Sequence, residues 1–264
     1  MSLFSIFRER GLNPTIFKGW AISRYFPISQ PRQYNDIDVI VDSSIFPSAT
    51  QFAKSEYFRR LRIDLHNELR ELDTVLWDTV FSRTQLVKIG ETDIRVLCPE
   101  DHLRVLCSHW LMDGGEFRHR LWDFYYLIDA TRDTFDWDLC LRDISPNRRE
   151  WVECVVGLTH KYLDLNIDDL PFAEKIRELP KWLIKAVENE WEQGVPQRPI
   201  LTTLNNPKEF IKQFKKRISP NPLRAVVDME GSFYRPKLTY YRIGSFFKRG
   251  SAMIKRIFTI AFSR

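Results

Sequence analysis

The chain has 264 residues, of which 44% are hydrophobic and 14% aromatic. This composition excludes a disordered protein, because disordered chains lack the apolar residues that build a core. No uncharged apolar run approaches the roughly 18 residues that span a bilayer, so no transmembrane helix is expected. At the N-terminus the apolar residues precede the charges, which is the reverse of a secretory signal peptide. The 4 cysteines are widely spaced without a C-x-x-C pair, which favours the cytoplasm over an oxidising compartment.

The net charge of +5 is unevenly distributed. The segment 207–264 carries 14 Lys and Arg against 3 Asp and Glu, and no acidic residue follows Glu230. The preceding residues carry an excess of acids. A basic tail of this kind either contacts a polyanion or remains a solvated extension.

The first 98 residues mix strand and helix patterns, which predicts an α+β domain with a small, mostly antiparallel or mixed sheet. Alternating or β-branched runs predict the strands, and runs with helical spacing between them predict helices. The expected strands are 15–17, 37–41, 62–69, 75–80, 85–89 and 94–97, and the expected helices are 20–26 and 52–61.

The second region, 99–195, has the pattern of a helical bundle. Pro99 followed by Glu100 and Asp101 is typical of a helix start, and four apolar stripes at helical spacing follow. Prolines between 196 and 207 mark a linker, so 196–264 is expected to be a linker and a basic C-terminal extension.

The strongest chemical pattern is Asp36-Ile37-Asp38 at the start of a predicted strand. Residues two apart on a strand point to the same face, so the two carboxylates would project into one space. Like charges at that distance favour a cation between them, and Mg²⁺ prefers oxygen ligands of this kind together with substrate phosphates. An isolated D-x-D pattern is more often a solvated face.

Three neighbouring features strengthen this interpretation. Lys18-Gly19 lies at a predicted strand-to-helix junction, where glycine permits close backbone approach and free N–H groups face a phosphate. A further strand presents Asp64 and His66 on one face, and Arg24 and Arg32 lie where they could reach a triphosphate. Each feature alone is more typical of a surface ion pair, but together they describe a site for Mg²⁺ and a nucleoside triphosphate.

Five segments in order resemble the uncharacterised bacterial nucleotidyltransferase family of the DNA polymerase beta superfamily. The resemblance covers about residues 14–165. The segments are Phe17–Pro27 with Tyr34–Val41, Ile63–His66, Pro99–Leu103, Leu106–His109 and Arg120–Asp123.

This resemblance implies that Asp36, Asp38 and Asp64 hold one or two Mg²⁺ ions, with His66 beside them. It implies that Gly19 and Trp20 shape the phosphate loop, that Lys18 lies near the triphosphate, and that Arg120 and Asp123 line the cleft from the helical side. Two positions depart from the superfamily pattern: Trp20 replaces the usual serine of the phosphate loop, and Asn35 replaces the usual glycine before the first aspartate.

The expected function is therefore Mg²⁺-dependent transfer of a nucleoside monophosphate to an acceptor hydroxyl, in a cleft between the sheet and the helical bundle. The alternative is a catalytically degraded relative that acts as a binding or regulatory module. Either protein would be cytoplasmic or peripheral to the inner membrane face.

Two further patterns carry weaker hypotheses. Lys248-Arg249 and Lys255-Arg256 recur seven residues apart beside large apolar residues, which is typical of a basic amphipathic helix. Such a helix would dock on the protein itself, on an anionic membrane surface or on a protein partner, whereas nucleic acid is not expected. The spacing of His102, His109 and His119 does not suit zinc, and these residues are expected to pack helices or line the cleft.

Overall fold

The computed structural model describes residues 7, 9, 11–54, 62–69, 72–195, 198, 200–203, 205–218 and 221–262, and within the last helix it describes side chains up to Ser251. The chain divides into two compact units. Unit 1 comprises Met1–Leu106 and Trp122–Ile144, and unit 2 comprises Cys107–Leu121 and Ser145–Arg264. The boundaries predicted from the sequence at 98 and 195 stay predictions.

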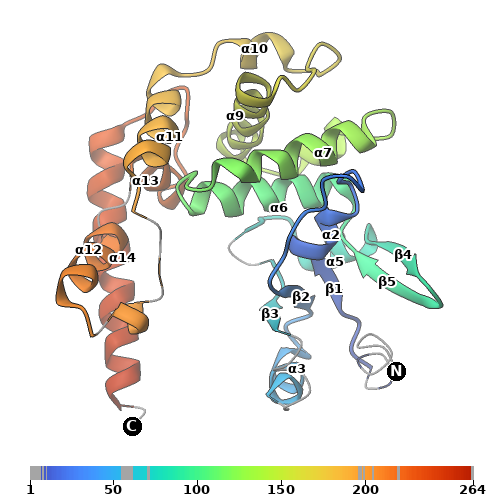
Figure 1. Ribbon diagram of the computed structural model, residues 1–264, viewed down its shortest axis with the longest axis horizontal. Helices are drawn as coiled ribbons and strands as arrows, with labels where there is room; N and C mark the ends of the chain where they lie inside the picture. The colour runs from blue at the N-terminus through green and yellow to red at the C-terminus, as the bar shows by residue number, and fades with distance from the viewer. Residues whose placement is uncertain are drawn as a thin grey trace. The chain divides into compact units, whose positions relative to one another are not determined.

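Unit 1 is built on a five-stranded mixed sheet with the order β3-β2-β1-β5-β4 (Figure 1). β1 pairs antiparallel with β2 and parallel with β5, β2 pairs parallel with β3, and β4 and β5 form an antiparallel hairpin. The predicted α+β class with a small mixed sheet is therefore confirmed. The strands are β1 (Thr15–Phe17), β2 (Ile37–Val41), β3 (Ile63–Asn67), β4 (Gln85–Ile89) and β5 (Thr92–Val96).

Alternation along β2 assigns its side chains to two cores. Val39 and Val41 pack with Ala49 of α3 (Phe46–Ala53) on one face. Ile40 packs on the other face with residues of α5 (Trp77–Ser82) and α6 (Pro99–Met112). Asp38 shares the face of Ile40, because residues two apart on a strand point the same way.

Three predicted elements differ from the structure. The predicted strand 75–80 is wrong: residues 77–82 form helix α5, in which Trp77 and Val80 are buried at helical spacing. The helix expected at 20–26 is the shorter α2 (Gly19–Ser23). The helix expected at 52–61 corresponds to the end of α3, and residues 55–61 lie outside the described part of the chain.

The remaining elements are helical. Pro99 starts α6, as the sequence predicts, and Asp136 caps α8 by accepting a hydrogen bond from the Leu139 N–H. These elements are η1 (Arg118–Arg120), α7 (Leu121–Thr131), α8 (Trp137–Arg142), α9 (Pro146–Leu163), α10 (Ala173–Arg177), α11 (Lys181–Gln193), η2 (Ile200–Thr203), α12 (Pro207–Ile218), α13 (Pro222–Asp228) and α14 (Leu238–Phe262). Within the described residues, none of the helices combines the length and apolarity needed to cross a membrane.

In unit 2, the connection between α13 and α14 is fixed by two tryptophans. The Trp151 indole N–H donates to the Gly231 carbonyl at 2.9 Å, and the Trp182 indole N–H donates to the Phe233 carbonyl at 2.8 Å. The Phe233 ring is fully buried and lies 6.2 Å and 5.7 Å from the two indole centroids. These contacts attach the segment that leads into the long helix α14 to α9 and α11.

The Phe233 anchor gives a stability prediction. Phe233→Ala should lower the free energy of unfolding by about 3–5 kcal/mol, because it empties a fully buried aromatic site. Phe247→Ala is the matched control: its side chain is exposed, so that change should cost less than about 0.5 kcal/mol. Chemical denaturation measures both values, and equal losses would show that Phe233 is not an anchor.

Candidate active site

The site is built around a strained turn between β1 and α2. Lys18 has φ 52° and Gly19 has φ 23°, so the backbone enters the left-handed region at two consecutive residues. A Cβ on Gly19 would lie 3.3 Å from the Asp36 carbonyl oxygen and 3.7 Å from Asp38 Oδ2. Glycine therefore permits this turn to approach β2 closely.

A buried histidine of α6 holds the turn. The Lys18 backbone N–H donates to His102 Nε2 at 2.9 Å, across 84 residues of sequence. His102 is fully buried, and burial together with the charges of Arg24, Arg32 and Lys18 holds its pKa well below the ordinary value. The imidazole is therefore neutral, with Nε2 as acceptor and the proton on Nδ1.

Asp38 lies next to this turn and is nearly buried, with an exposed fraction of 7%. Its Oδ1 accepts from Lys18 Nζ at 3.3 Å and lies 3.1 Å from His66 Nε2. Burial alone would raise the pKa of the Asp38 carboxyl, but the hydrogen bond from His66 and the charge of Lys18 outweigh burial and hold it below its ordinary value. Asp38 is therefore an ionised carboxylate in a mostly buried position.

Parallel pairing of β2 and β3 brings two further groups to Asp38. Asp38 is in register with Asp64, and Ile40 with His66. His66 Nε2 lies 3.3 Å from Asp64 Oδ2, and one potential ligand atom from each of Asp38, Asp64 and His66 lies within 4.8 Å of the others. Burial would lower the pKa of His66, but its hydrogen bonds to Asp38 and Asp64 outweigh burial and raise it. Such a set of donors can hold a metal ion.

Asp36 has a different position from its predicted partner. It precedes β2 and is exposed, and the metal-ligand group found among the described residues does not include it. Its carbonyl lies against Gly19, and its charge contributes to raising the pKa of Arg32. Its predicted role as a metal ligand stays a prediction.

Arg32 connects the turn to helix α7. Its guanidinium donates to both carboxylate oxygens of Asp123, from Nε to Oδ1 at 2.5 Å and from Nη2 to Oδ2 at 2.8 Å. Its Nη1 also donates to the Gly19 carbonyl at 3.3 Å. Burial would lower the pKa of Arg32, but its hydrogen bonds and charge interaction with Asp123 raise it. Arg32 and Asp123, both predicted from the sequence as nucleotide-binding residues, are thus brought together as a charged pair beside the turn.

Three other predicted residues take separate positions. Arg24 donates to the Tyr25 hydroxyl and lies over the Tyr25 ring at 4.6 Å. Trp20 is half-buried and packs against the hydrophobic cluster that contains Ile16. Arg120 belongs to η1 of unit 2, with its guanidinium 5.9 Å from the Phe117 ring centroid.

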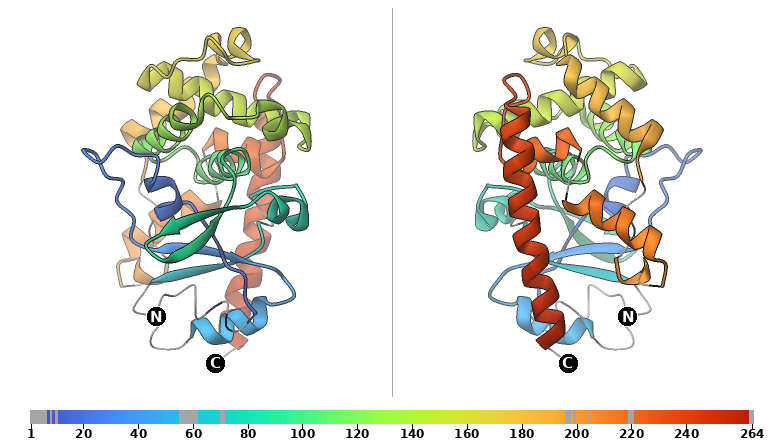
Figure 2. Two further views of the ribbon diagram at one scale, coloured as in Figure 1. Left: turned by 90° about the vertical axis from the view of Figure 1, so that its right-hand side faces the viewer. Right: turned by 90° about the vertical axis from the view of Figure 1, so that its left-hand side faces the viewer.

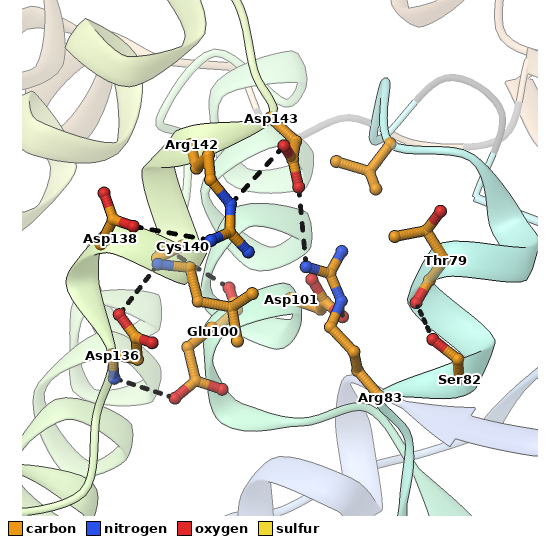
Figure 3. Close-up of polar contacts among 12 residues, drawn as sticks. Thr79, Ser82, Arg83, Glu100, Asp101, Asp136, Asp138, Cys140, Arg142 and Asp143 are labelled. Carbon is orange, nitrogen blue, oxygen red and sulfur yellow. Dashed lines mark hydrogen bonds and ion pairs between the residues drawn. The ribbon is translucent and has the colours of Figure 1, made fainter.

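A polar network fixes the start of α6, the helix that carries His102. Figure 3 shows Arg83, Glu100, Asp101 and Asp136 of this network. Glu100 accepts from the Asp136 backbone N–H at 3.1 Å. Asp101 is fully buried and pairs with Arg104 at 2.5 Å and with Arg83 at 3.3 Å. The sequence predicted Pro99, Glu100 and Asp101 as a helix start and His102 as a packing or cleft residue. It did not predict that this segment supports the turn at Lys18 and Gly19.

Unit 2 contains a separate pocket of about 520 Å³. Its lining includes Trp182, Lys185, Arg224 and Arg242 and none of the predicted site residues. The candidate active site is therefore defined by the convergence of side chains in unit 1 and not by this pocket.

The hydrogen bond from Lys18 to His102 can be tested by substitution. His102→Leu should lower the free energy of unfolding by about 1–3 kcal/mol, because it leaves the buried Lys18 N–H without an acceptor. His102→Gln provides an amide oxygen near the position of Nε2 and should cost less. Denaturation of both variants measures the difference, and equal losses would mean that the acceptor contributes nothing beyond packing.

The low pKa of His102 also predicts a pH dependence. Below about pH 6.5 the unfolded state takes up a proton on this histidine and the folded state does not. The free energy of unfolding therefore decreases as the pH is lowered. The loss approaches about 1.4 kcal/mol per pH unit for this one group and is absent at neutral pH. The difference in stability between the wild type and His102→Gln should therefore shrink on acidification, and a constant difference would contradict a neutral His102.

Comparisons with known proteins identify the family of the chain. Residues 2–164 match the model of a family described as uncharacterised nucleotidyltransferase. No curated protein matches the chain. A similar solved structure is that of an antigenic nucleotidyltransferase-like protein from Paracoccidioides brasiliensis, at 13% identity and a TM-score of 0.47, over 66% of this chain and 88% of that one. Because the family model matches more than half of the sequence, including β1, β2 and β3, the chain belongs to the uncharacterised nucleotidyltransferase family.

Proposed function

We propose that the protein is a Mg²⁺-dependent nucleotidyltransferase of the DNA polymerase beta superfamily, acting in the cytoplasm. It would move a nucleoside monophosphate from a nucleoside triphosphate to a hydroxyl group of an acceptor. The observation that carries the proposal is the convergence of Asp38, Asp64 and His66 beside the Lys18-Gly19 turn. Family membership supports the reaction class.

The donor set fits Mg²⁺ through its carboxylates. Mg²⁺ in phosphoryl-transfer sites takes one or two carboxylates, several waters and substrate phosphate oxygens, and Asp38 and Asp64 provide that number. Asp36 would join them as a third carboxylate. A bound Mg²⁺, or a pair of ions, would neutralise phosphate charge as it develops in the transition state.

The residues of the chain would divide the remaining work. Lys18 and the backbone N–H groups of Gly19 and Trp20 would bind the triphosphate, with Arg24 and Arg32 adding positive charge. The acceptor oxygen forms a bond to the α-phosphorus, the bond between the α- and β-phosphoryl groups breaks, and pyrophosphate leaves. Asp64 or His66 would take the proton of the acceptor hydroxyl.

Nucleotide binding tests this proposal through Asp38. The wild type should melt at a higher temperature with at least one of ATP, GTP, CTP and UTP, and only when Mg²⁺ is present. A ligand at about 100 times its Kd stabilises by about 2.7 kcal/mol, which a thermal-shift titration resolves. Asp38→Asn should abolish the shift, because it removes a charged oxygen ligand.

Asp42→Asn is the matched control for this titration. Asp42 follows β2, is only half-buried and lies outside the metal-ligand group, so its variant should shift as the wild type does. An undiminished shift in Asp38→Asn would overturn the metal assignment.

One observation favours a second candidate, a binding or regulatory module with a degraded site. Asp38 Oδ1 already has two polar neighbours, Lys18 Nζ at 3.3 Å and His66 Nε2 at 3.1 Å, so the carboxylate has partners within the protein. Such a module would contact an anionic membrane surface or a protein partner through its basic tail, and nucleic acid is not expected. It should show no Mg²⁺-dependent shift with any of the four nucleotides.

A further inference from the structure

In the described part of helix α14 in unit 2, one side of the helix packs on α13 and the segment after it, and the opposite side is exposed. We call the packed side the attached side. On the attached side, Ser245 donates to Asp228 Oδ2 at 2.5 Å, and the Arg249 guanidinium binds the same carboxylate, with Nη2 2.7 Å from Oδ1. A Cβ on Gly231 would lie 2.6 Å from the Tyr241 ring, which shows how closely that side of the helix packs. The orientation of α14 on α13 is therefore fixed by specific contacts.

Large apolar side chains gather on the opposite side. The exposed fractions are 62% for Tyr240, 54% for Ile243, 46% for Phe246 and 68% for Phe247. At about 100° per residue these four lie within an arc of roughly 120°, centred opposite the side that carries Ser245. We call these four residues the apolar face of α14.

Two exposed basic residues of this helix lie outside the apolar face. On the same helical projection, Arg242 lies just beyond the Phe246 edge, and Lys248 lies farther beyond the Tyr240 edge, toward the attached side, where its Nζ donates to the Asp228 carbonyl at 2.7 Å. Acidic residues are absent from the sequence after Glu230, so nothing on this helix offsets those charges. In the sequence, Phe247 and Lys248 are followed one heptad later by Ile254 and Lys255, whose side chains lie outside the described set.

We propose that the apolar face of α14 lies on an anionic phospholipid surface, parallel to the membrane plane. An apolar arc bordered by Lys and Arg is the arrangement that inserts rings among acyl chains while the cations contact phosphate headgroups. The helix runs 25 residues as a single rod (Figure 2), about 37 Å long at 1.5 Å per residue. The apolar face occupies the part of this rod from Tyr240 to Phe247, and the Lys and Arg residues of the segment, with no acidic residue after Glu230, complement anionic headgroups.

This inference does not depend on nucleotidyl transfer. Of the two contacts proposed for the basic tail, an anionic membrane surface and a protein partner, it selects the membrane. Asp38→Asn should leave lipid binding unchanged. A failure of lipid binding and a failure of nucleotide binding are therefore separate results.

The experiment is flotation of the full chain with phosphatidylcholine vesicles that contain or lack phosphatidylglycerol. The wild type should float only with the anionic vesicles, and added salt should weaken binding, because salt screens the Lys and Arg charges. The double variant Ile243→Glu with Phe247→Glu should lose roughly tenfold or more of its partition coefficient, because two carboxylates replace apolar side chains that enter the interface.

Ile211→Glu is the matched control, since Ile211 is an apolar side chain of α12 with an exposed fraction of 52%. It should float as the wild type does, and melting curves of all variants verify that they are folded. Equal flotation of the double variant and the wild type, or no flotation at all, would overturn the proposal. A wild type that is dimeric by sedimentation and becomes monomeric in the double variant would overturn it too, because a second copy would then cover the face.

Discussion

The hydrogen bond from the Lys18 backbone N–H to His102 is the contact on which the candidate active site depends. A left-handed lysine followed by a glycine at φ 23° is a costly conformation, and a buried acceptor compensates part of that cost. Because the turn is held in this form, Gly19 reaches the backbone of Asp36 and the carboxylate of Asp38. Strain of this kind is typical of sites where a backbone must bind a ligand closely.

Helix α6 supplies the rigidity that this contact needs. Three consecutive residues at its start, Glu100, Asp101 and His102, bind three different parts of unit 1: the Asp136 backbone, two arginines and the Lys18 turn. Asp101 is fully buried and paired with both Arg104 and Arg83, and removal of one partner from a buried ion pair typically costs about 3–5 kcal/mol. The buried ion pairs of Asp101 with Arg104 and Arg83 therefore hold the start of α6, and with it His102, in place. The same network lies far from the apolar face of α14 in sequence, and the two features involve different units.

Local patterns were sufficient to predict most strands. They also indicated that Asp64 and His66 share a face and could form a site with Asp38, because residues two apart on a strand point the same way. Local patterns failed at 75–80, where β-branched Val75 and Val80 favoured a strand. The burial of Trp77 and Val80, three apart, and Asp78 in the first turn are helical features that a period-two reading overlooks. The Lys18–His102 and Arg32–Asp123 contacts join residues 84 and 91 positions apart. No local period encodes such pairs, so the sequence predicted their members as candidates or packing residues without predicting their partners.

The central claim is that this constellation transfers a nucleoside monophosphate. The most direct measurement incubates the protein with Mg²⁺, an α-phosphate-labelled nucleoside triphosphate and a fractionated cell extract, and follows the label and pyrophosphate together. The account predicts that the label enters one fraction with equimolar release of pyrophosphate. Under the same conditions, Asp38→Asn should neither transfer the label nor release pyrophosphate. Release of orthophosphate without transfer of the label, or equal transfer by the variant, would contradict it.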